Sequence, residues 1–120
     1  MTAPTDRYTR YSDFFLFYLR EHGQPATRAF HYVAAVASLS VLAWGLIAGP
    51  WWIALLAPVA GYGPAWASHA FIERNKPATF SYPLWSLISD YYMTWLWLTD
   101  RLPEYLARAG VTDGKAQAAE

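Results

Sequence analysis

Three histidines, His22, His31 and His69, are the only histidines in this 120-residue chain, and Glu73 follows the third by one helical turn. Residues at i and i+4 lie on one face of a regular helix, so His69 and Glu73 can point the same way. Imidazole and carboxylate groups suit iron(II), manganese or zinc, and two histidines with one carboxylate leave open positions on non-haem iron. The residue types therefore predict a metal site formed by His22, His31, His69 and Glu73.

Two apolar segments joined by a turn must bring these ligands together. Residues 29–48 carry no charge and have about the length needed to cross a hydrocarbon core. Gly49-Pro50 is a turn signal, and residues 51–72 are again without formal charge. This pattern predicts an antiparallel transmembrane hairpin, with Trp51 and Trp52 at the membrane interface near its tip.

Counting from the turn places two of the histidines at one depth. His31 stands 19 residues before Pro50 and His69 stands 19 residues after it, which puts both about 28 Å from the tip. The break at Gly23 and Pro25 allows His22 to fold back to the same level. For any single histidine, an ordinary hydrogen-bonded polar group near the membrane surface is the alternative. The alignment of three histidines and an acid favours a metal site.

The remaining segments complete an all-α integral membrane bundle. Ser12 and Asp13 are N-cap candidates for a short amphipathic helix ending near His22. A third apolar segment, residues 83–98, contains Asp90 and spans the membrane, re-enters it or lies in its interface. We expect one membrane-embedded domain over residues 1–108, followed by a disordered tail over residues 109–120.

Charge and composition restrict the topology and the chemistry. The hairpin tip carries no Lys or Arg, whereas the opposite end carries Arg20, Arg28, Arg74 and Lys76. The positive-inside rule places both ends of the hairpin in the cytoplasm. The absence of cysteine excludes disulfides, zinc–thiolate sites, iron–sulfur clusters and cysteine nucleophiles. A net charge of zero gives no indication of a nucleic-acid partner.

Five segments carry a family resemblance, namely YLREHGQP at 18–25, RAFH at 28–31, GYGPAWASH at 61–69, ERNKPATF at 73–80 and YPLWSLISD at 82–90. They resemble, from about residue 12 to 93, a family of small membrane proteins long described as a domain of unknown function. Its fungal member is an iron(II)-dependent 2-hydroxy fatty acid dioxygenase of alpha-oxidation, which serves phytosphingosine breakdown. The chain is more similar to the bacterial-type branch than to the fungal enzyme. Its membrane would be a bacterial inner membrane or the endoplasmic reticulum, according to source.

The resemblance implies that His22, His31 and His69 hold iron(II). The substrates would be a 2-hydroxy fatty acid and molecular oxygen, and the product a fatty acid shorter by one carbon. Arg28 is a candidate partner of the substrate carboxylate, or else a topology charge at the interface. Asp90 and Asn75 are candidates to support the ligands, but Asp90 can equally be an exposed interfacial residue and Asn75 can serve the turn before Pro77.

Two alternative functions remain open from the sequence. A small b-type haem protein would use His31 and His69 as axial ligands. A non-catalytic membrane scaffold would need no metal at all. A homodimer is compatible with so thin a bundle, although no motif specifies one, and membrane lipid is an expected partner.

Overall fold

The computed structural model describes residues 8–111, and every regular element in that range is helical. The α-helices are α1 (Tyr11–Glu21), α2 (Pro25–Ile47), α3 (Ala57–Ser68), α4 (Pro83–Leu98) and α5 (Leu102–Ala109). Two 3-10 segments, η1 (Trp51–Leu56) and η3 (Ala78–Phe80), and one π-helical turn, η2 (His69–Glu73), complete the fold. The all-α prediction is confirmed for this range.

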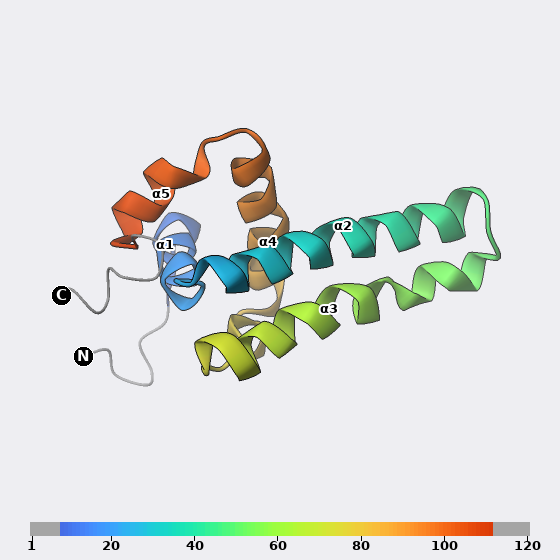
Figure 1. Ribbon diagram of the computed structural model, residues 1–120, viewed down its shortest axis with the longest axis horizontal. Helices are drawn as coiled ribbons and strands as arrows, with labels where there is room; N and C mark the ends of the chain where they lie inside the picture. The colour runs from blue at the N-terminus through green and yellow to red at the C-terminus, as the bar shows by residue number, and fades with distance from the viewer. Residues whose placement is uncertain (1–7, 112–120) are drawn as a thin grey trace.

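A long hairpin forms one half of the molecule. α2 runs out to the turn at Gly49 and Pro50, and η1, α3 and η2 return beside it (Figure 1). Small residues on the inner faces of the two arms let the backbones approach closely, and those most buried are Ala34, Ala35, Ser38, Gly45, Ala65 and Ser68. The predicted fold point at Gly49-Pro50 is therefore where the chain turns.

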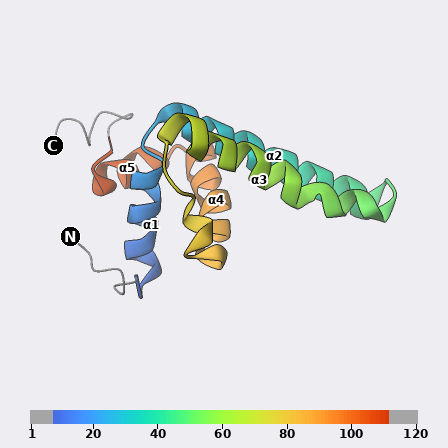
Figure 2. The same ribbon diagram turned by 90° about the horizontal axis from the view of Figure 1, so that it is seen from below.

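The other half gathers around the open end of the hairpin. α1, α4 and α5 enclose a core of large side chains, in which Phe14, Tyr18, Leu19, Met93 and Leu96 are fully buried. α4 runs across the hairpin rather than along it, as both ribbon views show (Figures 1 and 2). This half fixes the orientation of α1 and thereby the position of His22.

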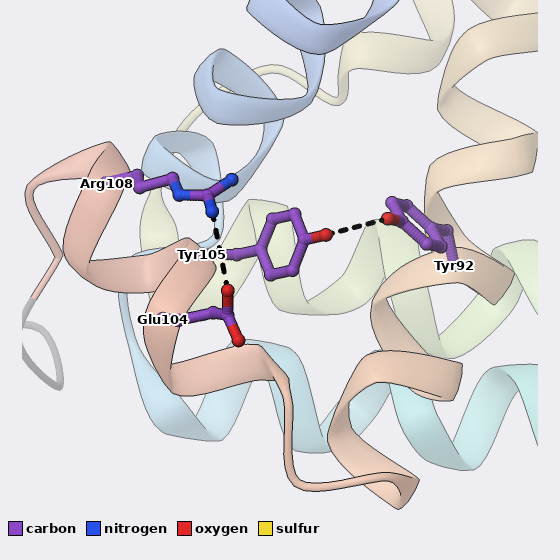
Figure 3. A network of polar contacts seen from close by, with 4 residues as sticks. All are labelled: Tyr92, Glu104, Tyr105 and Arg108. Carbon is purple, nitrogen blue, oxygen red and sulfur yellow. Dashed lines mark hydrogen bonds and ion pairs between the residues drawn. The ribbon is translucent and has the colours of Figure 1, made fainter.

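α5 is attached to α4 by an aromatic and polar network (Figure 3). The hydroxyl of Tyr92 donates a hydrogen bond of 3.2 Å to the hydroxyl of Tyr105. Arg108 lies over the Tyr105 ring, 5.0 Å from its centroid, and pairs with Glu104 at 3.4 Å. Because Leu102 and Leu106 are buried on the opposite face, α5 closes the core instead of extending into solvent.

Several sequence predictions about the elements are modified by the structure. α1 begins after Arg10, so Ser12 and Asp13 lie in its first turn and not at the N-cap. Among the described residues, α2 is the one helix long and apolar enough to cross a membrane. The returning arm is divided into 3-10, α and π segments, and the 16-residue α4 is too short to count as a span.

The predicted tail begins inside α5, which ends at Ala109. Gly110 caps the helix in the left-handed conformation, and Val111 is buried against the core. Residues 112–120 of the predicted tail lie outside the described residues.

Candidate metal centre

Three elements converge on the histidines. His22 is the C-cap of α1, His31 lies in the second turn of α2, and His69 is the first residue of η2. Each side chain is at most 2% exposed. The Nε2 atom of His22 lies 3.1 Å from Nε2 of His31 and 3.0 Å from Nε2 of His69, and ligand atoms of all three lie within 4.8 Å of one another.

The other ring nitrogen of each histidine has its own acceptor. Nδ1 of His22 donates to the carbonyl of Tyr18 at 2.6 Å, and Nδ1 of His31 donates to the carbonyl of Thr27 at 2.8 Å. Carbonyl oxygens accept only, so in both rings the proton is on Nδ1. In a neutral imidazole this leaves Nε2 as an unprotonated lone pair.

Asn75 gives His69 the same tautomer. The Asn75 Oδ1 atom lies 2.6 Å from Nδ1 of His69, while its Nδ2 donates to the carbonyl and to Oε1 of Glu21 at 3.1 and 3.2 Å. Because the amide nitrogen faces two acceptors, Oδ1 must be the atom that faces the histidine. Three Nε2 lone pairs therefore point at one another with no proton between them.

Such an arrangement fits a divalent cation. Lone pairs about 3 Å apart repel unless a positive group lies among them. Two nitrogen ligands at right angles on a metal, with bonds of about 2.1 Å, would lie roughly 3.0 Å apart, which matches the two short separations. The carbonyl and amide partners on Nδ1 are the outer-shell partners that metal-bound histidines ordinarily have.

Electrostatics favour the neutral, ligating form of His22. Burial, and then proximity to His31 and His69, hold the pKa of His22 well below its usual range. The ring of Tyr18 stacks on the His22 imidazole, with centroids 3.9 Å apart. Deprotonated imidazole is the form that binds metal, so the site is prepared for a cation at neutral pH.

Glu73 is not brought into the histidine cluster. Its Oε2 accepts a hydrogen bond of 2.7 Å from the backbone N–H of Gln24, the N-cap residue of α2. The chain reverses directly after Glu73, where Arg74 is left-handed. The i+4 spacing thus directs this carboxylate to the start of α2, where free N–H groups and the helix dipole favour an anion.

Arg28 also lies apart from the histidine pocket. Its Nη1 donates to the carbonyl of His22 at 2.9 Å, and the side chain is only 5% exposed. It lines a different cavity, together with Tyr32 and Trp97. In this structure Arg28 ties the loop that carries His22 to α2, whereas the sequence suggested contact with a substrate carboxylate.

Asp90 lies at the wall of the histidine pocket. It lines that pocket together with all three histidines, and the hydroxyl of Tyr18 donates to its Oδ1. Burial raises the pKa of Asp90 to about 7. Tyr18 thus contacts both groups, since its hydroxyl bonds to Asp90 and its ring stacks on His22.

Tyr18 and Thr27 are the supporting residues that sequence reasoning missed. Each precedes its histidine by four residues, and each offers a backbone carbonyl to Nδ1 of that histidine. A helical i−4 carbonyl is available to any side chain that folds back along its helix. The spacing was visible in the sequence, but the backbone role leaves no signature in residue type.

The cavity at the histidines is very small. Its volume is about 10 Å³, roughly that of one water or ion. A porphyrin has no room between His31 and His69, which argues against the b-type haem alternative.

One comparison with known proteins, that with protein families, gives a match. A family model described as 2-hydroxy-palmitic acid dioxygenase Mpo1-like matches residues 8–102. The chain belongs to the Mpo1-like family. No curated protein and no solved structure gave a match. The matched range contains all three histidines and confirms the resemblance inferred from the sequence. The family description points to a dioxygenase acting on a 2-hydroxy fatty acid.

Proposed function

We propose that this protein is an iron(II)-dependent dioxygenase that shortens 2-hydroxy fatty acids by one carbon. The observation that carries the proposal is the convergence of three buried Nε2 lone pairs, each fixed by an acceptor on Nδ1. Three histidines occupy three positions on a metal and leave others open for substrate and oxygen. The family description supports the reaction class.

The proposed reaction balances without a further reductant. The bond between carbons 1 and 2 of the 2-hydroxy acid breaks, and one molecule of oxygen enters. The products are the one-carbon-shorter acid, carbon dioxide and water. Bound iron(II) would supply oxygen activation and a point of attachment for the carboxylate and 2-hydroxyl of the substrate. The protein's part is to hold the three imidazoles in position and to exclude bulk water from their pocket.

We also propose that the hairpin is embedded in a membrane, with its open end at the cytoplasmic surface. The outer faces of α2, η1 and α3 are apolar, and Val36, Ile47, Trp51 and Val59 are each more than half exposed. An apolar surface of this extent is unusual for a protein in water. The basic residues lie at the other end, beside the histidines, as the positive-inside rule expects for a cytoplasmic face.

Anaerobic reconstitution tests the proposed reaction. Purified protein is loaded with iron(II), then given oxygen and 2-hydroxypalmitic acid, and the product masses are measured. We expect pentadecanoic acid and carbon dioxide, with one oxygen consumed per acid. His31→Ala and His69→Ala should lose iron and activity together, while Gln24→Ala, an exposed polar site beside the cluster, should keep both.

Three results would contradict the proposal or part of it. Wild-type protein that holds no iron, and behaves like the histidine variants, would favour a non-catalytic scaffold. A Soret band in the visible spectrum of the purified protein would favour haem. If the protein binds iron but forms no shorter acid from substrates of any chain length tested, the proposed reaction is wrong and the proposed metal site still stands.

A further inference from the structure

A second, larger cavity lies along the inside of the hairpin. It has a volume of about 320 Å³ and is lined from α2, η1, α3 and α4. Its lining is largely aliphatic, with Ala35, Leu42, Ala57 and Leu87 among the contributors. We call this cavity the hairpin groove. Its size is that of a small-molecule site.

The groove adjoins the histidine pocket. Tyr62 and Asp90 line both cavities, so the two share a wall at the open end of the hairpin. The polar groups of the groove gather toward α4. There the hydroxyl of Tyr91 donates to the Ser38 Oγ at 2.8 Å, while Ser38 itself donates to the carbonyl of Ala35. Ser38 and Tyr91 are thus satisfied within the protein, and beyond Tyr62 and Asp90 the rest of the groove offers an acyl chain only apolar contacts.

The length of the groove suits one acyl chain. Leu42, at the far end, follows His31 by 11 residues along α2, which is a distance of about 16 Å. One leaflet of a membrane is half of the hydrocarbon thickness of about 30 Å, so the histidine pocket and the groove together are about as deep as one lipid tail. At its far end the arms close, because a Cβ at position 45 would collide with the backbone nitrogen of Ala54, which lines the groove.

We propose that the hairpin groove holds the acyl tail of the substrate, and that its far end limits the chain length accepted. This inference rests on the proposed function and adds to it the position of the acyl tail. The carboxylate and 2-hydroxyl would lie among the histidines, the chain would pass Asp90 and Tyr62, and its terminal methyl would reach Leu42 and Ala57. A membrane phospholipid tail is the competing occupant of the groove, and the experiment below distinguishes it from the substrate tail.

Photocrosslinking locates the tail without any turnover. Iron(II)-loaded protein in phosphatidylcholine vesicles is kept free of oxygen and exposed to 2-hydroxypalmitic acid carrying a diazirine at its terminal carbon, and labelled peptides are mapped by mass spectrometry. We expect labels at Leu42 and in η1 and the start of α3. A phosphatidylcholine with the same diazirine tail should label outward residues such as Val36 and Val59 instead, because these are exposed.

A matched pair of variants tests the length limit. Ala57→Leu adds three carbons at the far end of the groove, whereas Val59→Leu adds one carbon to a residue that is 69% exposed and does not line it. Ala57→Leu should lower labelling by the palmitic probe about tenfold, as expected for an overpacked site. Labelling by a 2-hydroxydecanoic probe should be unchanged, and Val59→Leu should change neither.

The outcomes separate this inference from the proposed function. If the hydroxy acid labels the groove but the protein cannot form the shorter acid, the tail site is supported and the proposed reaction is wrong. Turnover by a protein whose labels spread over Val36 and Val59 would overturn the tail site and leave the reaction. Equal groove labelling by the phospholipid probe would also overturn it, since the groove would then be a general lipid site.

Discussion

A buried imidazole serves as a metal ligand when its second nitrogen has a fixed partner, and in this protein each of the three histidines has one. Two partners are backbone carbonyls, at Tyr18 and Thr27, and the third is the side chain of Asn75. Only the Asn75 partner can be removed by a side-chain substitution, because the other two partners are backbone carbonyls. Asn75 is therefore the residue at which the outer shell of the site can be tested directly.

Asn75→Ala should weaken iron(II) binding by about 10- to 100-fold, the usual effect of removing an outer-shell partner. Asn75→Asp keeps an acceptor for Nδ1 of His69 and should retain most of the affinity, although it loses the bonds to Glu21. Anaerobic titration with iron(II), or with cobalt(II) as a coloured substitute, measures both variants. Equal affinities for wild type and Asn75→Ala would contradict a role for this side chain at the metal.

The buried carboxyl of Asp90 predicts a pH effect on the stability of the metal-free protein. Its pKa is raised from 3.8 to about 7 in the folded state, mainly by burial. The folded state therefore prefers the protonated acid, and this contribution is complete below pH 4 and is lost as pH rises to about 7. Neutral His22 gives an opposite trend, because its pKa is lowered.

Comparison with Asp90→Asn isolates the carboxyl from the histidines. Thermal unfolding is measured from pH 4 to about 7 for both proteins. The melting temperature of wild type should fall relative to that of the variant across this window. Parallel curves would show that Asp90 titrates normally and is not held in a desolvated position.

At the scale of elements, the site depends on how the two ends of the hairpin are held. Glu73 joins the end of η2 to the N-terminus of α2, and Arg28 joins α2 to the carbonyl of His22. These contacts set the relative positions of the elements that carry His22, His31 and His69. Both residues were site candidates from the sequence, and in the structure both act on helix ends.

Glu73→Ala should separate a capping role from a ligand role. Loss of a helix N-terminal cap costs about 1 kcal/mol in the free energy of unfolding. We expect a lower melting temperature with one iron still bound per chain. If the variant instead loses iron while its melting temperature equals that of wild type, Glu73 is a metal ligand.

Two glycines in the hairpin give opposite predictions. A Cβ at position 45 would collide with the backbone nitrogen of Ala54 in the opposite arm and lie 2.9 Å from its Cα, whereas a Cβ at position 63 would meet nothing within 4 Å. Gly45→Ala should destabilise the protein by about 1–3 kcal/mol. Gly63→Ala should be neutral or stabilising by up to about 1 kcal/mol, because alanine favours helix. Circular dichroism on heating measures both, and equal effects would contradict the close packing of the arms.

At the scale of the whole molecule, the chain divides into an apolar hairpin and an aromatic helical cluster around its open end (Figure 2). The candidate metal centre lies where these halves meet, since α1 contributes His22 and the hairpin contributes His31 and His69. Placing the hairpin in a membrane sets the histidines near the surface and the groove at the depth of acyl tails. That topology can be tested because the chain has no cysteine.

Single-cysteine variants should report the two ends of the hairpin. Gln24→Cys lies at the histidine end and Ala48→Cys at the tip, and both positions are exposed. In sealed vesicles of known orientation, a membrane-impermeant maleimide should reach Gln24→Cys from the cytoplasmic side and Ala48→Cys from the other side. Labelling of both from one side would contradict a membrane-crossing hairpin.

The sequence by itself determined the all-α class, the fold point at Gly49-Pro50 and the convergence of His31 with His69, because helix rise and chain reversal fix depth by counting. The sequence also contains the motifs by which the family is recognised. Only the tertiary structure decided helix rotation and the direction of long side chains, which counting leaves free. For that reason the structure, and not the sequence, shows that Glu73 and Arg28 bind helix ends and that Asn75 binds His69. It also shows that the carbonyls of Tyr18 and Thr27 orient the other two histidines.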